Sequence, residues 1–172
     1  MDWSRIEAEM HELEKKLEYK FNDISLLAEA MKSQKLEKLP EDGENQNEYS
    51  NESLAFLGDT IIKFLIADFL YDDKVGEDKR KGRMTEFKKR LENNKIFHRI
   101  MKEEKLIMYS YHDKHFTMDK PPDHEKIVSK EHDPYIEAIA TAIYMDGGWD
   151  AVTTWFKEWL LPRLERYQDN DK

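Results

Sequence analysis

The sequence contains no cysteine, few residues that favour β-strands and few that favour turns. Its 172 residues include six glycines, five prolines, three valines and six threonines. The absence of cysteine excludes disulfides, thiolate metal sites and cysteine nucleophiles. Sandwiches and barrels need β-branched residues in their strands and glycine or proline in their turns, so the composition disfavours an all-β fold. The length fits a single domain over residues 1–172.

The chain also has little positive charge relative to negative. Its formal net charge is −9, and 38% of its residues are charged. Such a surface argues against nonspecific nucleic-acid binding through the whole molecule. The longest apolar-rich run, residues 54–70, contains three charged residues, which is unlike a membrane span. With no signal peptide and no cysteine, we expect a cytoplasmic protein without membrane segments.

The spacing of apolar residues predicts an all-α fold. Helices are expected over residues 2–18, about 24–36, 84–108 (one helix or a pair) and about 149–168. Asn22 or Asp23 is expected to cap the second of these. Polar loops are expected over residues 37–50, 72–83 and 109–132. The aromatic side chains expected to face the core include Trp3, Trp149, Trp155 and Trp159.

Two further segments, residues 51–71 and 135–145, are apolar on nearly all sides. A helix of this kind is central and buried. Asp133 is expected to cap the second helix with Pro134 as its first residue, and the sequence Asp146-Gly147-Gly148 to end it.

Each of these two helices carries one carboxylate in its apolar pattern, Asp59 in the first and Glu137 in the second. Burying an unpaired carboxylate costs several kcal/mol, so each acid needs a partner or a cation. Lys63 is the only lysine or arginine inside either helix. Two core helices that aim acids at one point would form a site for a hard cation such as Mg²⁺. In the alternative interpretation, Asp59 caps a break at Gly58 and Glu137 pairs with a surface lysine.

Several motifs resemble the ribonuclease III family. Residues 51–59, Asn-Glu-Ser-Leu-Ala-Phe-Leu-Gly-Asp, resemble its signature, Asn-Glu-Arg-Leu-Glu-Phe-Leu-Gly-Asp. Residues 137–148 are similar to its second acidic motif. Residues 17–30 and 84–97 are similar to its N-terminal segment and its middle helix. The resemblance covers about residues 10–165 in the expected order.

This resemblance implies an all-α, ribonuclease III-like endonuclease domain that forms a homodimer and cleaves double-stranded RNA. It implies Mg²⁺, with Mn²⁺ as a substitute, and products with 5′-phosphate ends. Asp59 and Glu137 match the essential acids of the family and would be catalytic metal ligands. Glu52 matches the first acid of the signature, and it lies seven residues before Asp59 on nearly the same helix face. Glu52 and Asp133 would be auxiliary metal ligands.

The chain departs from the family pattern at three positions. Ala55 stands where the signature has its second glutamate, Ser53 where it has arginine, and Pro134 where the second motif has aspartate. Asp133 lies one position earlier. A short "mini" branch of the family also has this alanine and lacks the second-motif aspartate, and it is still a nuclease.

The end of the chain at Lys172 leads us to expect no double-stranded-RNA-binding domain, so a separate RNA-binding protein is a possible partner. The alternative function is a catalytically impaired scaffold that binds RNA or a ribonucleoprotein.

Residues 77–90 have a local net charge of +4. Basic side chains of this kind track phosphates, so we expect RNA contacts here. The predicted RNA-binding residues are Lys79, Arg80, Lys81, Arg83, Lys88, Lys89 and Arg90. The alternative is a solvated turn and helix face.

Two His-Asp pairs, His112-Asp113 and His132-Asp133, raise a second enzyme class, the helical HD-type phosphohydrolases. In that class the pair lies inside an apolar helix, whereas these pairs lie in or beside a polar loop. Surface histidines are therefore the favoured interpretation.

Overall fold

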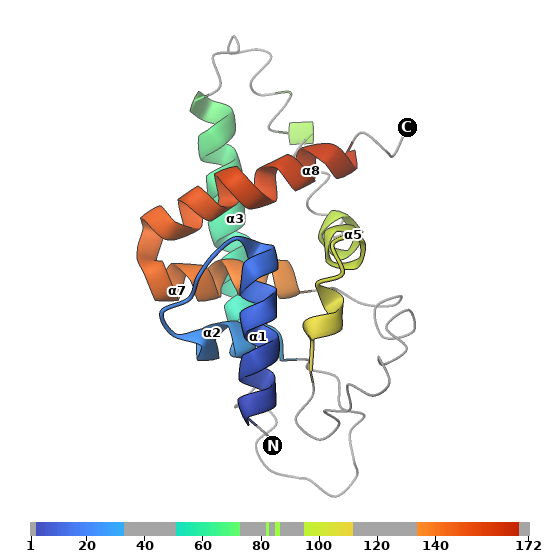
Figure 1. Ribbon diagram of the computed structural model, residues 1–172. Helices are drawn as coiled ribbons and strands as arrows, with labels where there is room; N and C mark the ends of the chain where they lie inside the picture. The colour runs from blue at the N-terminus through green and yellow to red at the C-terminus, as the bar shows by residue number, and fades with distance from the viewer. Residues whose placement is uncertain are drawn as a thin grey trace, which may run out of the picture.

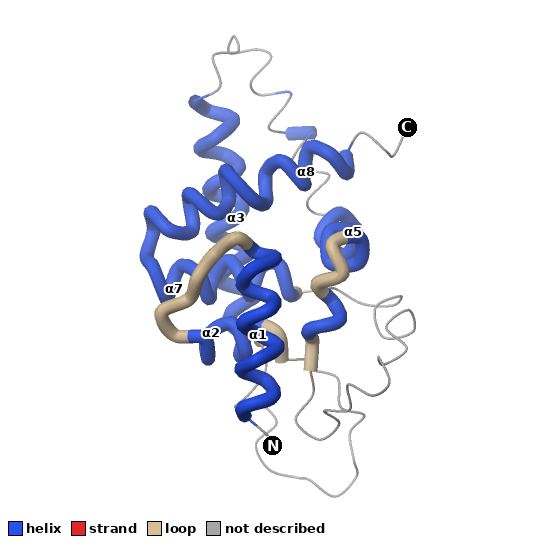
Figure 2. Tube along the Cα trace, in the orientation of Figure 1, coloured by secondary structure: helices blue, strands red, loops and turns tan. Residues whose placement is uncertain are grey.

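The computed structural model describes residues 3–32, 51–72, 82, 85–86, 95–111 and 134–168. Its named elements are α1 (Trp3–Leu17), α2 (Ile24–Ala30), α3 (Glu52–Asp72), α5 (Lys95–Glu103), η1 (Ile107–Tyr109), α7 (Tyr135–Trp155), η2 (Phe156–Leu160) and α8 (Leu161–Gln168). Figure 2 shows that the described chain consists of helices joined by loops. Within those ranges, extended pairing is limited to one bridge between Lys32 and Tyr111, and the all-α prediction is confirmed.

Helices α3 and α7 form the most extensive contact between described elements. In Figure 1, α7 crosses α3, the chain then turns at the end of the first part of α7, and it returns through η2 into α8. The turn lies at Gly148, whose φ of 78° lies in a region that glycine adopts readily and other residues rarely do. The predicted interruption at Asp146-Gly147-Gly148 is therefore confirmed.

Helix α1 buries the apolar stripe that its spacing predicts: Ile6, Met10, Leu13 and Leu17. Trp3 is 44% exposed, so its predicted place in the core is wrong. It is the first residue of the helix, one turn before the first buried residue, Ile6. Trp155 and Trp159 are buried, but Trp149 is 42% exposed and its predicted core position is also wrong.

Helix α2 begins where predicted and ends earlier. Asp23 caps it by accepting a hydrogen bond from the Ser25 N–H at 3.0 Å. The helix ends at Ala30, not near residue 36, because the chain turns into the bridge: the Met31 carbonyl accepts a hydrogen bond from the Tyr111 N–H at 3.2 Å. Residues 33–36 lie outside the described ranges.

The predicted segment 84–108 is helical at residues 85–86 and in α5, but α5 ends at Glu103. Residues 104–106 form a turn before η1, with Lys105 at a φ of 55°, so the prediction of a helix that continues to residue 108 is wrong. Helix α5 buries Ile96, Phe97 and Ile100, as expected. The predicted loop 37–50, most of 72–83 and residues 112–132 lie outside the described ranges. Among the helices described, none is long and apolar enough to cross a membrane.

The two helices predicted to be buried on all sides differ from that prediction in one respect. The first part of α7 is buried from Tyr135 to Ile143, but α3 leaves one face open. Phe56 is 81% exposed and Phe64 is 55% exposed. The sequence of α3 is apolar on nearly all sides, so it did not show which face packs in the core and which face is exposed. Helix α7 begins at Tyr135, with Pro134 at the N-cap position that the sequence assigned to Asp133.

Candidate active site

The candidate site lies where α3 crosses α7 at Gly58 and Glu137. A Cβ atom added to Gly58 would overlap the backbone carbonyl of Glu137. Only glycine allows the two helix backbones to approach so closely. One turn before Gly58, the Thr141 hydroxyl donates a 2.7 Å hydrogen bond to the Leu54 carbonyl across the same crossing. These contacts place the backbone that carries Asp59 beside the backbone that carries Glu137.

Asp59 follows Gly58 on an uninterrupted helix, so the interpretation that it caps a break is wrong. Its side chain is 44% exposed, so the prediction that this carboxylate is buried is wrong. One carboxylate oxygen, Oδ2, accepts a 2.7 Å hydrogen bond from the ammonium group of Lys63, one turn further along α3. The sequence noted Lys63 as the only basic residue in either central helix, and the structure places it on Asp59.

Glu137 lies in the first turn of α7 and is only 1% exposed. The crossing therefore joins a buried carboxylate to a half-exposed one. Carboxylate oxygens suit Mg²⁺, which commonly binds proteins through one or two carboxylates together with waters and substrate phosphates. Across the described ranges there is no cluster of three or more ligating side chains. Asp59 and Glu137 together offer the kind and number of protein ligands that such a cation takes.

Among the other predicted site residues, only Glu52 lies within the described ranges. Glu52 is exposed in the first turn of α3, about two turns before Asp59. The structure does not describe Asp133, the seven predicted RNA-binding lysines and arginines, or either His-Asp pair, all of which lie outside the described ranges. Their roles remain predictions.

Asn51 positions the start of α3, a role that the sequence analysis did not assign. Its side chain is fully buried, and its Nδ2 donates a 2.9 Å hydrogen bond to the Ala30 carbonyl at the end of α2. Its own carbonyl accepts the first bond of the helix, from the Ala55 N–H at 2.8 Å. An asparagine directly before a helix is a typical cap, but the bond to Ala30 joins α3 to α2 and depends on the tertiary fold.

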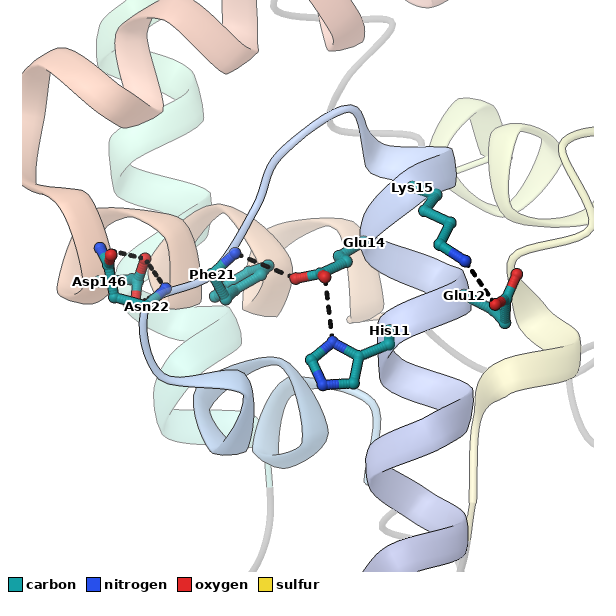
Figure 3. Close-up of polar contacts among 7 residues, drawn as sticks. All are labelled: His11, Glu12, Glu14, Lys15, Phe21, Asn22 and Asp146. Atoms are coloured by element: carbon teal, nitrogen blue, oxygen red, sulfur yellow. Dashed lines mark hydrogen bonds and ion pairs between the residues drawn. The ribbon is translucent and has the colours of Figure 1, made fainter.

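Asp146 fixes the turn at the end of the first part of α7. Its carboxylate accepts hydrogen bonds from the Tyr19 hydroxyl at 2.8 Å, the Asn22 N–H at 3.0 Å and the Asp23 N–H at 2.8 Å. Figure 3 shows Asp146 facing Asn22 across the gap between the two segments. The sequence indicated only that Asp146 ends a helix; its distant partners depend on the tertiary fold.

These hydrogen bonds help to shift the pKa values of Asp146 and Tyr19. Burial alone would raise the pKa of Asp146. The hydrogen bonds from the backbone N–H groups of Asn22 and Asp23 and from the Tyr19 hydroxyl lower the pKa by more than burial raises it, so the pKa lies below its ordinary value. Burial, followed by the bond to Asp146, raises the pKa of Tyr19 well above its usual value. Asp146 is therefore charged and Tyr19 neutral at neutral pH.

A second carboxylate binds the segment between α1 and α2, whose N–H groups also bind Asp146. Glu14 of α1 is buried, and it accepts a 3.1 Å hydrogen bond from the Phe21 N–H. Its other oxygen lies 3.0 Å from His11 Nδ1, as Figure 3 shows. The segment after α1 is thus held between Glu14 and Asp146.

Exposed apolar side chains on α3 and near the turn in α7 are together called the apolar face. It comprises Phe56, Leu57, Phe64, Tyr144, Met145 and Trp149. The rings of Phe64 and Trp149 meet edge to face with centroids 5.3 Å apart, and Tyr144 and Trp149 meet at 6.2 Å. Exposed apolar side chains that contact one another, as the three rings of Phe64, Tyr144 and Trp149 do, are typical of surfaces that bind another molecule.

Comparisons with known proteins agree with this arrangement. The family described as Ribonuclease-III-like matches residues 23–164. Ribonuclease 3 of Aquifex aeolicus is 30% identical over 162 residues, which are 91% of this chain and 64% of that protein. Ribonuclease 3 of Caldanaerobacter subterraneus is 28% identical over 140 residues, which are 81% of this chain and 57% of that protein. The chain thus spans about three fifths of the length of these two relatives.

The fold is also similar to a solved structure. The nuclease domain of ribonuclease III from Campylobacter jejuni superposes with a TM-score of 0.60 at 24% identity, covering 90% of this chain and 94% of that one. That structure is described as showing flexibility in a region involved in dimer formation. The family match extends over most of the chain, and this protein belongs to the ribonuclease III-like family.

Proposed function

We propose that this protein is an endoribonuclease that hydrolyses phosphodiester bonds in double-stranded or structured RNA with the help of Mg²⁺. The observation that carries the proposal is the contact of Gly58 with the Glu137 backbone, because Asp59 is the next residue after Gly58 along α3. Family membership supports RNA as the substrate. Asp59 and Glu137 would hold the cation, which when bound supplies an activated water and stabilises the leaving oxygen.

The residues around these acids have separate tasks. Glu137 is buried, so its carboxylate is fixed by packing, whereas the half-exposed Asp59 can meet substrate from solvent. Thr141 and Gly58 hold the crossing together. Glu52 and Asp133 are proposed as auxiliary acids, and 5′-phosphate ends are the products that the family resemblance implies.

The apolar face supports a homodimer. Phe56 exposes most of its side chain, and Leu57 and Phe64, seven residues apart, lie on one side of α3. Burying such residues between two copies would remove them from water at about 25 cal/mol for each Å². The Campylobacter jejuni relative, whose solved domain has a region involved in dimer formation, points to the same assembly.

The direct test is cleavage of a long RNA duplex in the presence of Mg²⁺. Wild type should cleave, and the products should be degraded by an exonuclease that requires a 5′ phosphate. Asp59→Asn and Glu137→Gln should each lose activity by about a hundredfold or more, because each removes charge that stabilises the transition state. Asp68→Asn makes the same kind of change at an exposed position of the same helix and should retain activity.

A second function, an RNA-binding scaffold without catalysis, is favoured by a different observation. Lys63 already occupies an oxygen of Asp59, and the described ranges hold no cluster of three ligating side chains. Ala55, one turn before Asp59, stands where the family signature has a glutamate. RNA binding that persists in Asp59→Asn, with no cleavage by wild type, would establish this alternative. Cleavage gained by Ala55→Glu would indicate instead a nuclease site that has too few ligands.

A further inference from the structure

We infer that Lys63 is a phosphate-contacting residue of the nuclease site, held on Asp59 until a divalent cation takes that carboxylate. This inference rests on the proposed nuclease function and adds a residue to it. Its starting point is the 2.7 Å contact between the Lys63 ammonium group and Asp59 Oδ2. Asp59 is the more exposed of the two acids at the α3–α7 crossing.

Lys63 is the one basic residue that the two crossing helices carry near the site. Lys63 is the only lysine or arginine in the sequences of α3 and α7. Residues 55, 59 and 63 succeed one another at intervals of four, so they form a row along one side of α3. That row presents alanine, a carboxylate and an ammonium group. The family signature has acids at the positions of residues 55 and 59, one turn apart. This chain has an acid only at residue 59, and a lysine follows it one turn later.

Stability does not account for the pair. The side chains of Lys63 and Asp59 are 47% and 44% exposed. Ion pairs between exposed side chains contribute little to folding, because water screens them and both side chains lose freedom. The ammonium group is therefore able to leave Asp59 and reach a ligand at the surface.

The local charge determines how Lys63 responds when a cation binds. The Lys63 ammonium group already lies on Asp59 Oδ2, so a divalent cation at Asp59 competes directly with the ammonium group. Once displaced, Lys63 is a positive charge on the exposed side of α3, one turn from the acid. A phosphate oxygen of RNA is the anion that this site would meet, and lysine binds phosphate as a compact point charge.

The first test measures metal binding without RNA. Mn²⁺ binding should be followed by the electron paramagnetic resonance signal of the free ion in wild type, Lys63→Met and Lys63→Arg. Lys63→Met should bind Mn²⁺ about five- to tenfold more tightly, because it removes a competing charge from Asp59. Lys63→Arg keeps the charge and should bind as wild type does.

The matched control is Lys15→Met. Lys15 forms a similar exposed ion pair within one helix, at 2.6 Å from Glu12 of α1, and this pair lies on a separate helix from Asp59. The variant should leave Mn²⁺ affinity and RNA cleavage unchanged. It therefore accounts for any general effect of removing one lysine from this acidic chain.

The second test measures the salt dependence of RNA binding in the Asp59→Asn background, where cleavage is absent. Adding Lys63→Met should reduce the slope of log affinity against log salt by about one, the value for one lost phosphate contact. Unchanged Mn²⁺ affinity in Lys63→Met, or an unchanged slope, would overturn the inference.

These outcomes separate the inference from the proposed function. If wild type cleaves RNA, Asp59→Asn does not, and Lys63→Met behaves as Lys15→Met does, only the role of Lys63 fails. If no variant cleaves RNA but Lys63→Met binds Mn²⁺ more tightly and loses one unit of salt slope, the nuclease function fails and Lys63 keeps its role in a binding site. If neither wild type nor Lys63→Met binds Mn²⁺, both fail.

Discussion

Gly58 and Glu137 meet backbone to backbone at the crossing of α3 and α7. This contact sets the separation of the two helices, because a side chain on residue 58 would require one backbone to move. Asp59 is the next residue along α3, so the contact that packs the core also brings the two candidate catalytic acids into one region.

Replacing Gly58 tests this relationship. Gly58→Ala should lower the free energy of unfolding by about 3 kcal/mol, because the added Cβ overlaps a backbone carbonyl that cannot rotate away. Urea denaturation followed by circular dichroism measures the change. Gly82→Ala is the control: its added Cβ meets nothing within 4 Å, and the helical position should become slightly more stable. Equal stability of the two variants would contradict the close approach.

The hydrogen bond across the crossing can be tested with a pair of threonines. Thr141→Val removes a buried 2.7 Å hydrogen bond to the Leu54 carbonyl and should cost about 1 kcal/mol of unfolding free energy. Thr153→Val makes the same change where, among the described residues, the buried hydroxyl has no hydrogen-bond partner. That variant should be neutral or more stable. A larger loss from Thr153→Val than from Thr141→Val would be inconsistent with the structure.

Asp146 should make stability depend on pH in a defined direction. Its pKa is lowered in the folded state, so its contribution is present above the unfolded value of about 3.9 and is lost as the pH falls through the lower, folded value. Asp146→Asn should cost about 2 kcal/mol at pH 7, and the difference from wild type should shrink below about pH 4.

Unfolding curves at several pH values between 7 and 3 measure this effect. Asp150→Asn, at an exposed position four residues further along α7, provides the control and should differ little from wild type at any pH. An Asp146→Asn difference that stays constant over the whole range would show that charge on Asp146 does not matter.

The apolar face should control association between copies of the chain. Phe56→Glu and Phe64→Glu place charge on the face and should convert a dimer to a monomer at micromolar concentration, as measured by sedimentation velocity. Met108→Glu changes another exposed apolar residue, 53% exposed on η1, and should leave association unchanged. Monomeric wild type, or dimers that persist in both phenylalanine variants, would contradict the proposed homodimer.

Periodicity in the sequence was sufficient to predict the main helices and the two acids. The apolar stripe of α1 and the nearly continuous apolar segments of α3 and α7 depend on short-range spacing, which the sequence shows directly. Asp59 and Glu137 were recognisable because each interrupts such a segment. The interruption at Gly148 was also predictable, since paired glycines favour backbone conformations that end a helix.

The tertiary structure decided which faces and side chains meet. Trp3, Trp149 and Phe64 fit a core pattern, but they are exposed because no described element covers them. Asp146 lies more than 120 residues from its hydrogen-bond partners at Tyr19 and Asn22, a relationship that local spacing cannot contain. The sequence by itself determined that two central helices each carry an acid. That the acids share one crossing depends on Gly58 packing against Glu137, a contact between segments 79 positions apart in the sequence.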